Sequence, residues 1–258
     1  MPEGLIEASI DERGVARIAI DNERHLNCLN SATAEAFTNA VNGFSGQDDL
    51  RVVVVTGNGP KAFMGGADLR ELAGLDVVSG RAFISRIHGM SMALRDCPVP
   101  VIARINGYCL GAGLEVAAAC DMRIASDKAV LGMPEVKVGL PSVVEAALFP
   151  QLIGWGKAKL LCYTGKSIDA EEALSWGLVE KIVPVDELDD AVECWVGHIL
   201  EGGPQAIRLQ KELIREWEVM PVGDAIQAGI RSFARAMATE EPKRMIAKTL
   251  ERLARRKG

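Results

Sequence analysis

Three loops, each expected to follow a strand, carry residues whose types and spacing could do chemistry. Two of them, residues 62–69 and 106–115, are glycine-rich and run directly into a predicted helix. Such turns can leave a backbone N–H free to face an anion at the start of a helix. Two loops of this kind could direct two N–H donors at one oxygen, which is what an oxyanion hole requires. The alternative is an ordinary strand-to-helix turn without a chemical role.

The third loop, residues 132–141, places Glu135 after a short strand among apolar neighbours. A carboxyl group in such surroundings is expected to have a raised pKa and could exchange protons near neutrality. Glu115 lies in the first turn of its predicted helix, where the helix dipole favours the ionised form. Two carboxylates with opposite tendencies are typical of an acid–base pair. The plainer interpretation is a helix-terminal charge at Glu115 and a surface carboxylate at Glu135.

Other motifs are excluded by their spacing. The three histidines, at positions 25, 88 and 198, are too far apart in sequence to predict a metal site. Residues 165–167 end like a phosphate loop, but position 160 is leucine where that motif needs glycine. Residues 111–113 lack the third glycine of a dinucleotide fingerprint, and no GxSxG elbow occurs. We expect His88 and the cysteines to have ordinary buried roles.

The elements that must position these loops follow from hydrophobic patterning. An apolar, β-branched run at 52–56 is typical of a strand buried on both faces. Strands alternate with helices in the front half, whereas only helices are expected after Pro141. This order predicts α/β layers followed by a helical extension. The expected elements are a hairpin at 5–20, strands at 52–56, 101–105, 121–126 and 129–132, and helices at 31–44 (N-capped by Ser31), 79–95, 113–120, 142–153, 155–163, 170–176, 187–200, 204–218 and 222–254.

Composition narrows the class of protein. The chain has 258 residues, of which 48% are hydrophobic and 25% charged, enough apolar material for a sizeable core. Its net charge of −6 argues against nucleic acid as the main partner. No apolar run approaches the roughly 20 residues of a membrane helix, and no secretory signal is visible. The six cysteines are scattered without a CxxC pair, as expected in a reducing compartment. These features predict a cytoplasmic globular protein.

Several motifs together resemble the crotonase (enoyl-CoA hydratase/isomerase) superfamily over nearly the whole chain. They occur in the order of that superfamily and are more specific than any single glycine loop. The matching segments are residues 61–69, 106–115, 120–121, 132–135, 164–168 with Ala173, and 177–179.

The resemblance implies an α/β fold, a crotonase-like spiral of strand–strand–helix units with a C-terminal helical trimerisation region. Residues 1–195 would form the core with an acyl-CoA site, and residues 196–258 the trimerisation region of a homotrimer or a homohexamer. The implied substrate is an acyl-CoA thioester. No separate cofactor is implied, since CoA is carried by the substrate, and neither nucleic acid nor membrane is expected as a partner.

The resemblance also implies roles for individual residues. The N–H groups of Ala67 and Ala112 would hold the thioester carbonyl. Glu115 and Glu135 would hold the water that adds across the neighbouring double bond. Residues expected along the CoA-bearing substrate are Arg24, His25, Leu26, Gly66, Asp68, Leu69, Arg70, Tyr108, Leu110 and Gly111. A basic run in the tail (Lys243, Arg244, Lys248, Arg252, Arg255, Arg256 and Lys257) is interpreted as a solvated helix face, with phosphate contact across a subunit interface as the alternative.

The chain departs from the superfamily pattern mainly after Glu135. Branched and acidic side chains in residues 139–146 replace a glycine-rich turn near the expected acyl pocket, which puts a straight-chain substrate in doubt. Aliphatic residues should line that pocket, among them Met133, Val138, Leu140 and Val144. Glu145 is expected on an exposed helix face, and a third carboxylate in the site is the alternative.

Hydration of an α,β-unsaturated acyl-CoA is the predicted reaction, because isomerase members typically retain only the glutamate that matches Glu135. The alternatives are double-bond isomerisation, thioester hydrolysis, and hydration coupled to retro-aldol cleavage. Members that bind RNA or serve only as scaffolds form a different class, which the negative charge and the two intact glutamates disfavour.

Overall fold

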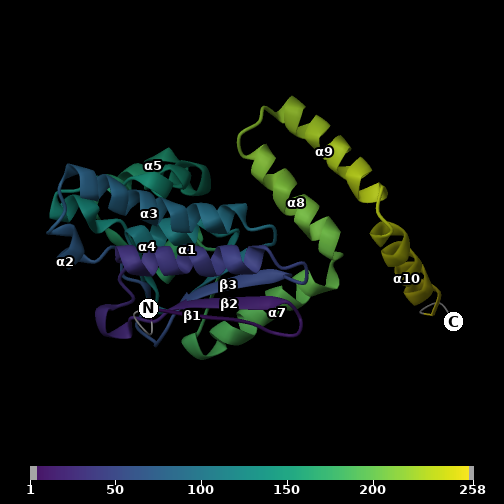
Figure 1. Cartoon of the computed structure of the whole chain (residues 1–258), viewed down its shortest axis with the longest axis horizontal. Coiled ribbons are helices and arrows are strands. Elements are labelled where there is room, and N and C mark those ends of the chain that lie inside the picture. Colours follow the sequence, from purple (N-terminus) through teal and green to yellow (C-terminus); the bar gives the residue numbers. More distant parts are fainter. Residues whose placement is uncertain (1–4, 256–258) are drawn as a thin grey trace.

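The computed structural model describes residues 5–255, and two sheets form its centre (Figure 1). All neighbouring strands of the larger sheet are parallel except the hairpin pair β1 and β2. The apolar run that predicted a doubly buried strand forms β3, whose first four residues are buried. In order across the sheet, the strands are β1 (Ile6–Ile10), β2 (Val15–Ile20), β3 (Val52–Gly57), β5 (Val101–Ile105), β7 (Met122–Ser126) and β10 (Lys181–Val183).

The smaller sheet consists of four short strands. Its order is β4 (Ala62–Met64), β6 (Tyr108–Leu110), β8 (Val130–Gly132) and β9 (Ser167–Asp169). Three of them, β4, β6 and β8, each come directly after a strand of the large sheet. The chain thus passes from a long strand to a short strand and then to a helix, and it repeats this order from β3 and from β5. The predicted spiral of strand–strand–helix units is confirmed. The three loops singled out in the sequence follow β4, β6 and β8, three strands paired side by side.

Helices cover the sheets and form the tail. Figure 1 shows α1 and α3 lying beside each other over the large sheet, whereas α7 lies on its other side. The α-helices are α1 (Ser31–Ser45), α2 (Leu69–Leu72), α3 (Val77–Asp96), α4 (Ala112–Ala119), α5 (Phe149–Thr164), α6 (Ala170–Trp176), α7 (Leu188–Glu201), α8 (Pro204–Trp217), α9 (Val222–Met237) and α10 (Glu241–Arg255). Short 3-10 helices occur at η1 (Glu23–His25), η2 (Pro134–Val138), η3 (Val144–Leu148) and η4 (Val185–Glu187).

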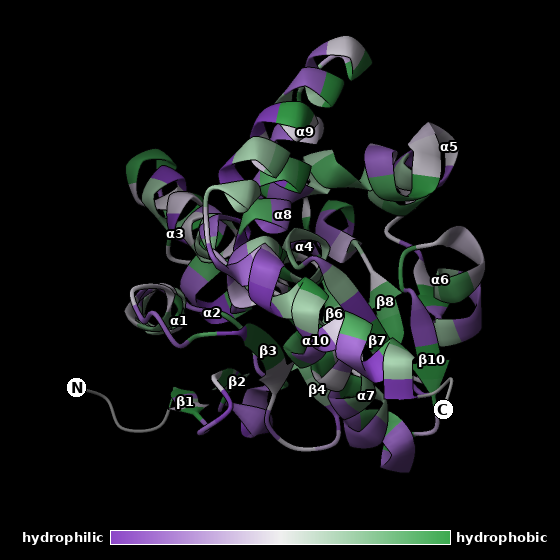
Figure 2. Cartoon of the chain, turned by 90° about the vertical axis from the view of Figure 1, so that its right-hand side faces the viewer, coloured by the Kyte–Doolittle hydropathy of each residue, from purple (hydrophilic) through white to green (hydrophobic). Residues whose placement is uncertain are grey.

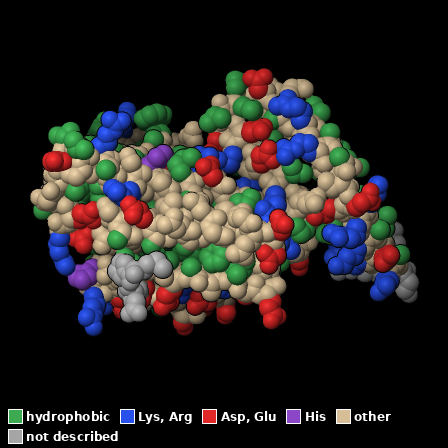
Figure 3. All heavy atoms as spheres, viewed as in Figure 1, with side chains coloured by type: hydrophobic (Ala, Val, Ile, Leu, Met, Phe, Trp, Pro, Cys, Tyr) green, Lys and Arg blue, Asp and Glu red, His purple; other side chains and the backbone are tan. Residues whose placement is uncertain are grey.

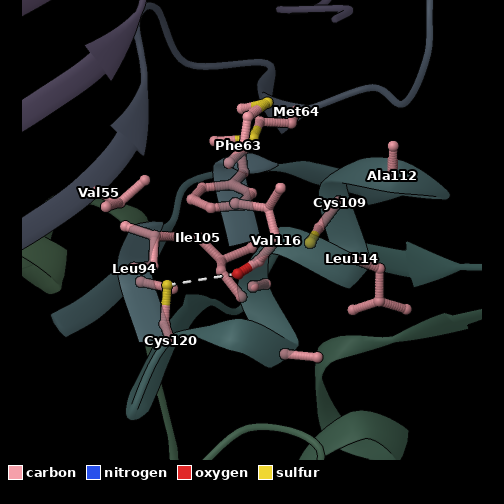
Figure 4. Packing of buried hydrophobic residues seen from close by; sticks show 14 of the residues in the cluster. Val55, Phe63, Met64, Leu94, Ile105, Cys109, Ala112, Leu114, Val116 and Cys120 are labelled. Atoms are coloured by element: carbon pink, nitrogen blue, oxygen red, sulfur yellow. Dashed lines mark hydrogen bonds between the residues drawn. The ribbon is translucent and has the colours of Figure 1, made fainter. Parts of the chain in front are cut away.

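The helix α4 runs through the main hydrophobic core, and all eight of its residues are buried. Figure 4 shows Val116 of this helix beside Phe63 and Ile105, and Leu114 belongs to the same buried cluster. A helix whose residues are all apolar except Glu115 packs in such an interior. The core therefore holds the start of α4, and with it Ala112 and Glu115, in a fixed position.

Several predicted elements are wrong in detail. Helix α1 is capped by the Asn30 side chain, which accepts from the Thr33 N–H at 2.8 Å, instead of by Ser31. The expectation of helices alone after Pro141 is contradicted by β9 and β10, which at three residues each are too short to show a strand period. The segment predicted as a helix from residue 142 is extended up to Val143, and the short η3 then precedes α5.

The single helix predicted over residues 222–254 is two helices, α9 and α10. Pro242 lies in the first turn of α10, where a missing N–H is tolerated, whereas inside one continuous helix it would remove a hydrogen bond and clash with the preceding turn. The buried Glu241 accepts hydrogen bonds from the N–H groups of Gln205 and Ala206 at the start of α8. This carboxylate therefore ties α10 back onto α8.

The last three helices extend away from the sheets (Figure 1). Helix α7 crosses the predicted boundary at residues 195–196 and packs on the large sheet through Leu188, Val192 and Val196. The division into a core of residues 1–195 and a tail of residues 196–258 stays a prediction. Arg256 and Lys257 of the predicted basic run lie outside the described residues.

Within residues 5–255, no helix is both long and apolar enough to span a bilayer.

Candidate active site

One cavity of about 870 Å³ brings most of the predicted site residues together. Its walls come from η1, from α2 and the loop before it, from α3, from the start of α4, and from η2 with the loop that follows it up to Val143. The predicted residues that line it are Ala67, Ala112, Glu115 and Glu135, with Arg24, His25, Leu26, Gly66, Asp68, Leu69, Arg70 and Gly111. Tyr108 and Leu110 are not among the lining residues, and their contact with a substrate stays a prediction.

The loop after β4 directs the Ala67 N–H away from its neighbouring strand. The Leu29 N–H donates to the Gly66 carbonyl, and the Asp68 N–H donates to the Leu29 carbonyl, each at 2.8 Å. In this parallel bridge the Gly66 carbonyl and the Asp68 N–H make the hydrogen bonds to Leu29. The N–H of Ala67, between them, therefore points away from Leu29. Ala67 lines the cavity, and within residues 5–255 its N–H donates to no acceptor.

Ala112 is the first residue of α4, where backbone N–H groups have no partner inside the helix. Its N–H has no acceptor among the residues described, although the Gly111 N–H before it donates to the Gly132 carbonyl at 2.9 Å. Gly111 has φ +52° and no side chain, and a Cβ there would lie 2.5 Å from Glu135 Oε1. The glycine therefore allows the carboxylate of Glu135 to approach the start of α4 closely.

Glu115 is only 2% exposed, and its Oε1 atom has no hydrogen-bond partner within the part of the chain described. Burial, followed by the negative charges of Glu135 and Glu145, raises the pKa of Glu115 to about 8. The sequence predicted the opposite tendency from the helix dipole. That prediction is wrong, because the loss of hydration in the core outweighs a dipole effect of about 1 kcal/mol.

Glu135 lies in η2 on the facing side of the cavity and is partly buried. Burial raises its pKa, as predicted, while a hydrogen bond from the Ser142 hydroxyl to Oε2 at 3.0 Å opposes that rise. Both carboxyl groups therefore resist ionisation, and the charge of one disfavours the charge of the other. Both carboxyl groups line one cavity, and burial raises the pKa of each instead of biasing the two in opposite directions.

A third carboxylate lies next to this pair. Glu145 was expected on an exposed helix face, but it is 5% exposed and its charge contributes to the raised pKa of Glu115. Its Oε1 atom lies 2.7 Å from Nδ1 of His88 on α3. The prediction of a buried His88 is also wrong, since 48% of its side chain is exposed.

Apolar residues that sequence reasoning missed form one wall of the cavity. Phe83 and Ile84 of α3 line it, with Leu72, Leu75 and Val143. Of the aliphatic residues that were predicted, Val138 and Leu140 line it, whereas Met133 and Val144 do not. The amphipathic pattern of α3 could have indicated a helix face, but only the fold shows that part of this face meets a cavity instead of the core.

Basic side chains gather at exposed positions around the same cavity. Arg24, His25 and Arg70 were predicted there, and Lys137 was missed. A cation beside an apolar cavity suits a ligand that has an anionic part and an apolar part. Among residues 5–255, no group of three or more histidine, cysteine, aspartate or glutamate side chains is placed to hold a metal ion.

The family model described as enoyl-CoA hydratase/isomerase matches residues 11–256. The chain belongs to this family. It is 33% identical to the short-chain-enoyl-CoA hydratase of Clostridium acetobutylicum and to the crotonyl-CoA hydratase of Syntrophomonas wolfei, each match covering 93% of both chains. Among solved structures, an enoyl-CoA hydratase from Bacillus anthracis superposes with a TM-score of 0.92 at 34% identity, over 96% of each chain.

Membership of the enoyl-CoA hydratase/isomerase family accounts for both the spiral and the tail, because these matches span nearly the whole chain. The roles of Ala67, Ala112, Glu115 and Glu135 remain predictions, and all four residues line the same cavity.

Proposed function

We propose that the protein adds water across the α,β double bond of an enoyl-CoA thioester. The observation that carries this proposal is the placement around one cavity of two protonatable carboxyl groups and of two backbone N–H groups that have no acceptor within residues 5–255. The names of the relatives from Clostridium acetobutylicum and Syntrophomonas wolfei support the same reaction.

The N–H groups of Ala67 and Ala112 would donate to the carbonyl oxygen of the thioester. Polarising this carbonyl makes the β-carbon electrophilic, and the oxygen gains negative charge as an enolate forms. Donors that are already in place stabilise this charge without reorganising, and each one lost typically costs about 3–4 kcal/mol. Since the donors are backbone groups, a bulky side chain at either position would act by filling the hole.

Glu115 and Glu135 would hold the attacking water between them. As the water oxygen bonds to the β-carbon, its proton passes to the ionised carboxylate, while the protonated carboxyl group gives a proton to the α-carbon. This chemistry requires one proton on the pair at the start. Burial of both groups, together with their mutual repulsion, favours that state near neutral pH.

The remaining parts of the cavity suit the other parts of the substrate. The apolar wall that includes Phe83, Ile84 and Leu75 would take the acyl chain, and the exposed Arg24 and Arg70 would meet the CoA phosphates. CoA then enters with the substrate, and no other organic group is invoked in the reaction.

Isotope incorporation tests the proposed reaction. Incubation of the protein with crotonyl-CoA in H₂¹⁸O should give 3-hydroxybutyryl-CoA with ¹⁸O at the β-carbon, and incubation in D₂O should place one deuterium at the α-carbon. A panel of short, long, branched and aromatic enoyl-CoA thioesters would then define the acyl group. Double-bond migration, release of free CoA, or chain cleavage as the main outcome would instead establish one of the alternative reactions.

We further propose that the tail joins copies of the chain into a trimer or a dimer of trimers. Large apolar side chains are exposed at helical spacing along α9, from Val222 through Ile226, Ile230 and Phe233 to Met237. Hydrophobic and hydrophilic residues alternate along α9 and α10 (Figure 2), and apolar side chains are exposed on the projecting helices (Figure 3). Sedimentation should give a trimer or hexamer, and Phe233→Asp should lower that mass. A wild-type monomer would contradict the proposal.

A further inference from the structure

Glu145 is buried although its sequence position suggested exposure. It is the second residue of η3, and the preceding Val144 has φ +38°. This left-handed backbone region is costly for a β-branched side chain and persists only where the surrounding structure holds it. The strained turn at Val144 is therefore part of the local structure that keeps the Glu145 carboxylate in the interior.

His88 holds one oxygen of this carboxylate. Its Nδ1 atom lies 2.7 Å from Glu145 Oε1, and nearly half of its side chain is exposed. His88 follows the cavity residue Ile84 by one turn of α3. The other oxygen, Glu145 Oε2, is buried without a hydrogen-bond partner in the described part of the chain. A buried carboxylate that is only half satisfied is expensive to keep, which argues for a role beyond packing.

The unsatisfied carboxylate belongs to the same group of charges as the proposed catalytic pair. The η3 segment packs against both α3 and α4, and the charge of Glu145 acts on Glu115. The titratable side chains around Glu115 come from four elements. They are Glu135 of η2, Glu145 of η3, Cys162 of α5 and, through Glu145, His88 of α3. The other titratable side chains that line the cavity are Arg24, His25, Cys28, Asp68, Arg70, Asp76 and Lys137.

We propose that Glu145, held by His88, is a positioning residue of the acid–base site that keeps one proton on the Glu115–Glu135 pair. This inference rests on the proposed hydratase function. Each turnover takes one proton from water and gives one proton to the α-carbon, so the reaction needs no external proton source. It does need the pair to start with one proton, and a third negative charge nearby opposes the loss of that proton.

The substitution Glu145→Gln removes the charge and keeps the shape. The basic limb of the pH profile of kcat/KM should then move to lower pH by at least about 0.5 units, because the pair loses its proton more easily. Glu145→Asp should leave the limb close to its wild-type position. Glu35→Gln is a matched control. Glu35 of α1 also pairs with a basic residue of α3, Arg86, at 2.5 Å, but this pair lies on the surface.

A titration without substrate separates this inference from the proposed function. With ¹³C-labelled glutamate, NMR should show the apparent pKa of Glu115 falling in Glu145→Gln and staying constant in Glu35→Gln. An unchanged Glu115 titration in a folded Glu145→Gln variant would overturn the inference. Absence of hydratase activity in the wild type would instead overturn the proposed function and leave this titration interpretable.

A second variant keeps the inference testable if Glu145→Gln fails to fold. His88→Ala removes the partner of Glu145 from a side chain that solvent reaches. We expect kcat to fall by about fivefold to tenfold with little change in KM, and added imidazole to restore it. Loss of activity that imidazole does not restore would show a structural role only, and so would a change confined to KM.

Discussion

Each end of α4 has a buried ionisable side chain beside it, but the hydrogen bonding of the two side chains differs. At the C-terminal end, the Arg123 guanidinium donates to the carbonyls of Cys120 at 2.8 Å and Leu178 at 3.0 Å and pairs with Glu180. At the N-terminal end, Ala112 leaves its N–H without an acceptor within residues 5–255, and Glu115 leaves one carboxylate oxygen without a partner there.

This difference distinguishes a buried polar group that serves the fold from buried polar groups that serve the reaction, at the two ends of one helix. Removal of a buried charge whose hydrogen bonds are all made destabilises the fold, because its partners are left unpaired. Groups that are buried and unpaired cost stability and gain partners only when a ligand arrives. The comparison therefore predicts that substitutions at the two ends will affect different properties of the protein.

Gly111→Ala should have the largest effect among the substitutions that break the N-terminal end. The new Cβ would lie 2.5 Å from Glu135 Oε1 on a backbone with φ +52°, so either Glu135 or the start of α4 must move. We expect hydratase kcat/KM to fall by at least about 10³-fold, as for loss of an oxyanion donor or a catalytic acid. Gly89→Ala is the control, because its nearest neighbour would be Thr38 Oγ1 at 3.9 Å. Equal activity in the two variants would contradict the close approach.

The pH dependence of stability should show the cost of burying Glu115. Its pKa is about 8 in the folded protein against 4.5 for a free side chain, so the unfolded chain loses the proton first as pH rises. The free energy of unfolding should therefore fall between pH 4.5 and about 8, by roughly 3–4 kcal/mol from this group.

Denaturant unfolding at several pH values measures this dependence. In Glu115→Gln the decline should become smaller by about the same 3–4 kcal/mol, since the amide does not titrate. If the free energy of unfolding fell with pH equally in wild type and variant, burial of Glu115 would not be the cause of the decline.

Arg123→Met should affect stability without affecting chemistry. Methionine keeps much of the apolar stem but leaves Glu180 Oε1 and three backbone carbonyls without the guanidinium donor. We expect a loss of about 3 kcal/mol in the free energy of unfolding. Activity per folded molecule should stay within about twofold of wild type.

The exposed pair of Arg235 and Glu212 supplies the matched control for Arg123. Arg235→Met should lower the free energy of unfolding much less than Arg123→Met, because solvent screens the exposed pair. If Arg123→Met lowered the activity per folded molecule strongly but hardly changed the free energy of unfolding, the distinction between the two ends of α4 would be wrong.

Much of this site follows from the order of motifs along the chain. The loops that contain Ala67, Ala112, Glu115 and Glu135 were predicted to meet, and all four residues line one cavity. The long strands were also predictable, because a run such as residues 52–57 is apolar throughout. The three-residue strands were not, since they carry too few residues to show a period.

The electrostatics of the site depended on packing that the sequence does not reveal. Whether Glu115 is hydrated is decided by η3, some thirty residues later, which lies over α4. The same packing buries Glu145 and brings it to His88, a contact between residues 57 positions apart. Helix propensity and dipole arguments are local, and therefore they gave the wrong tendency for Glu115 and the wrong exposure for Glu145.

The most direct test of the account compares hydration of crotonyl-CoA by the wild type with that by Glu115→Gln and Glu135→Gln. Stopped-flow loss of the enoyl-thioester absorbance should slow by about 10²–10⁴-fold in each variant, while both variants stay folded and bind the substrate. Hydration at the wild-type rate by both folded variants would contradict the central claim that these two carboxyl groups move the protons.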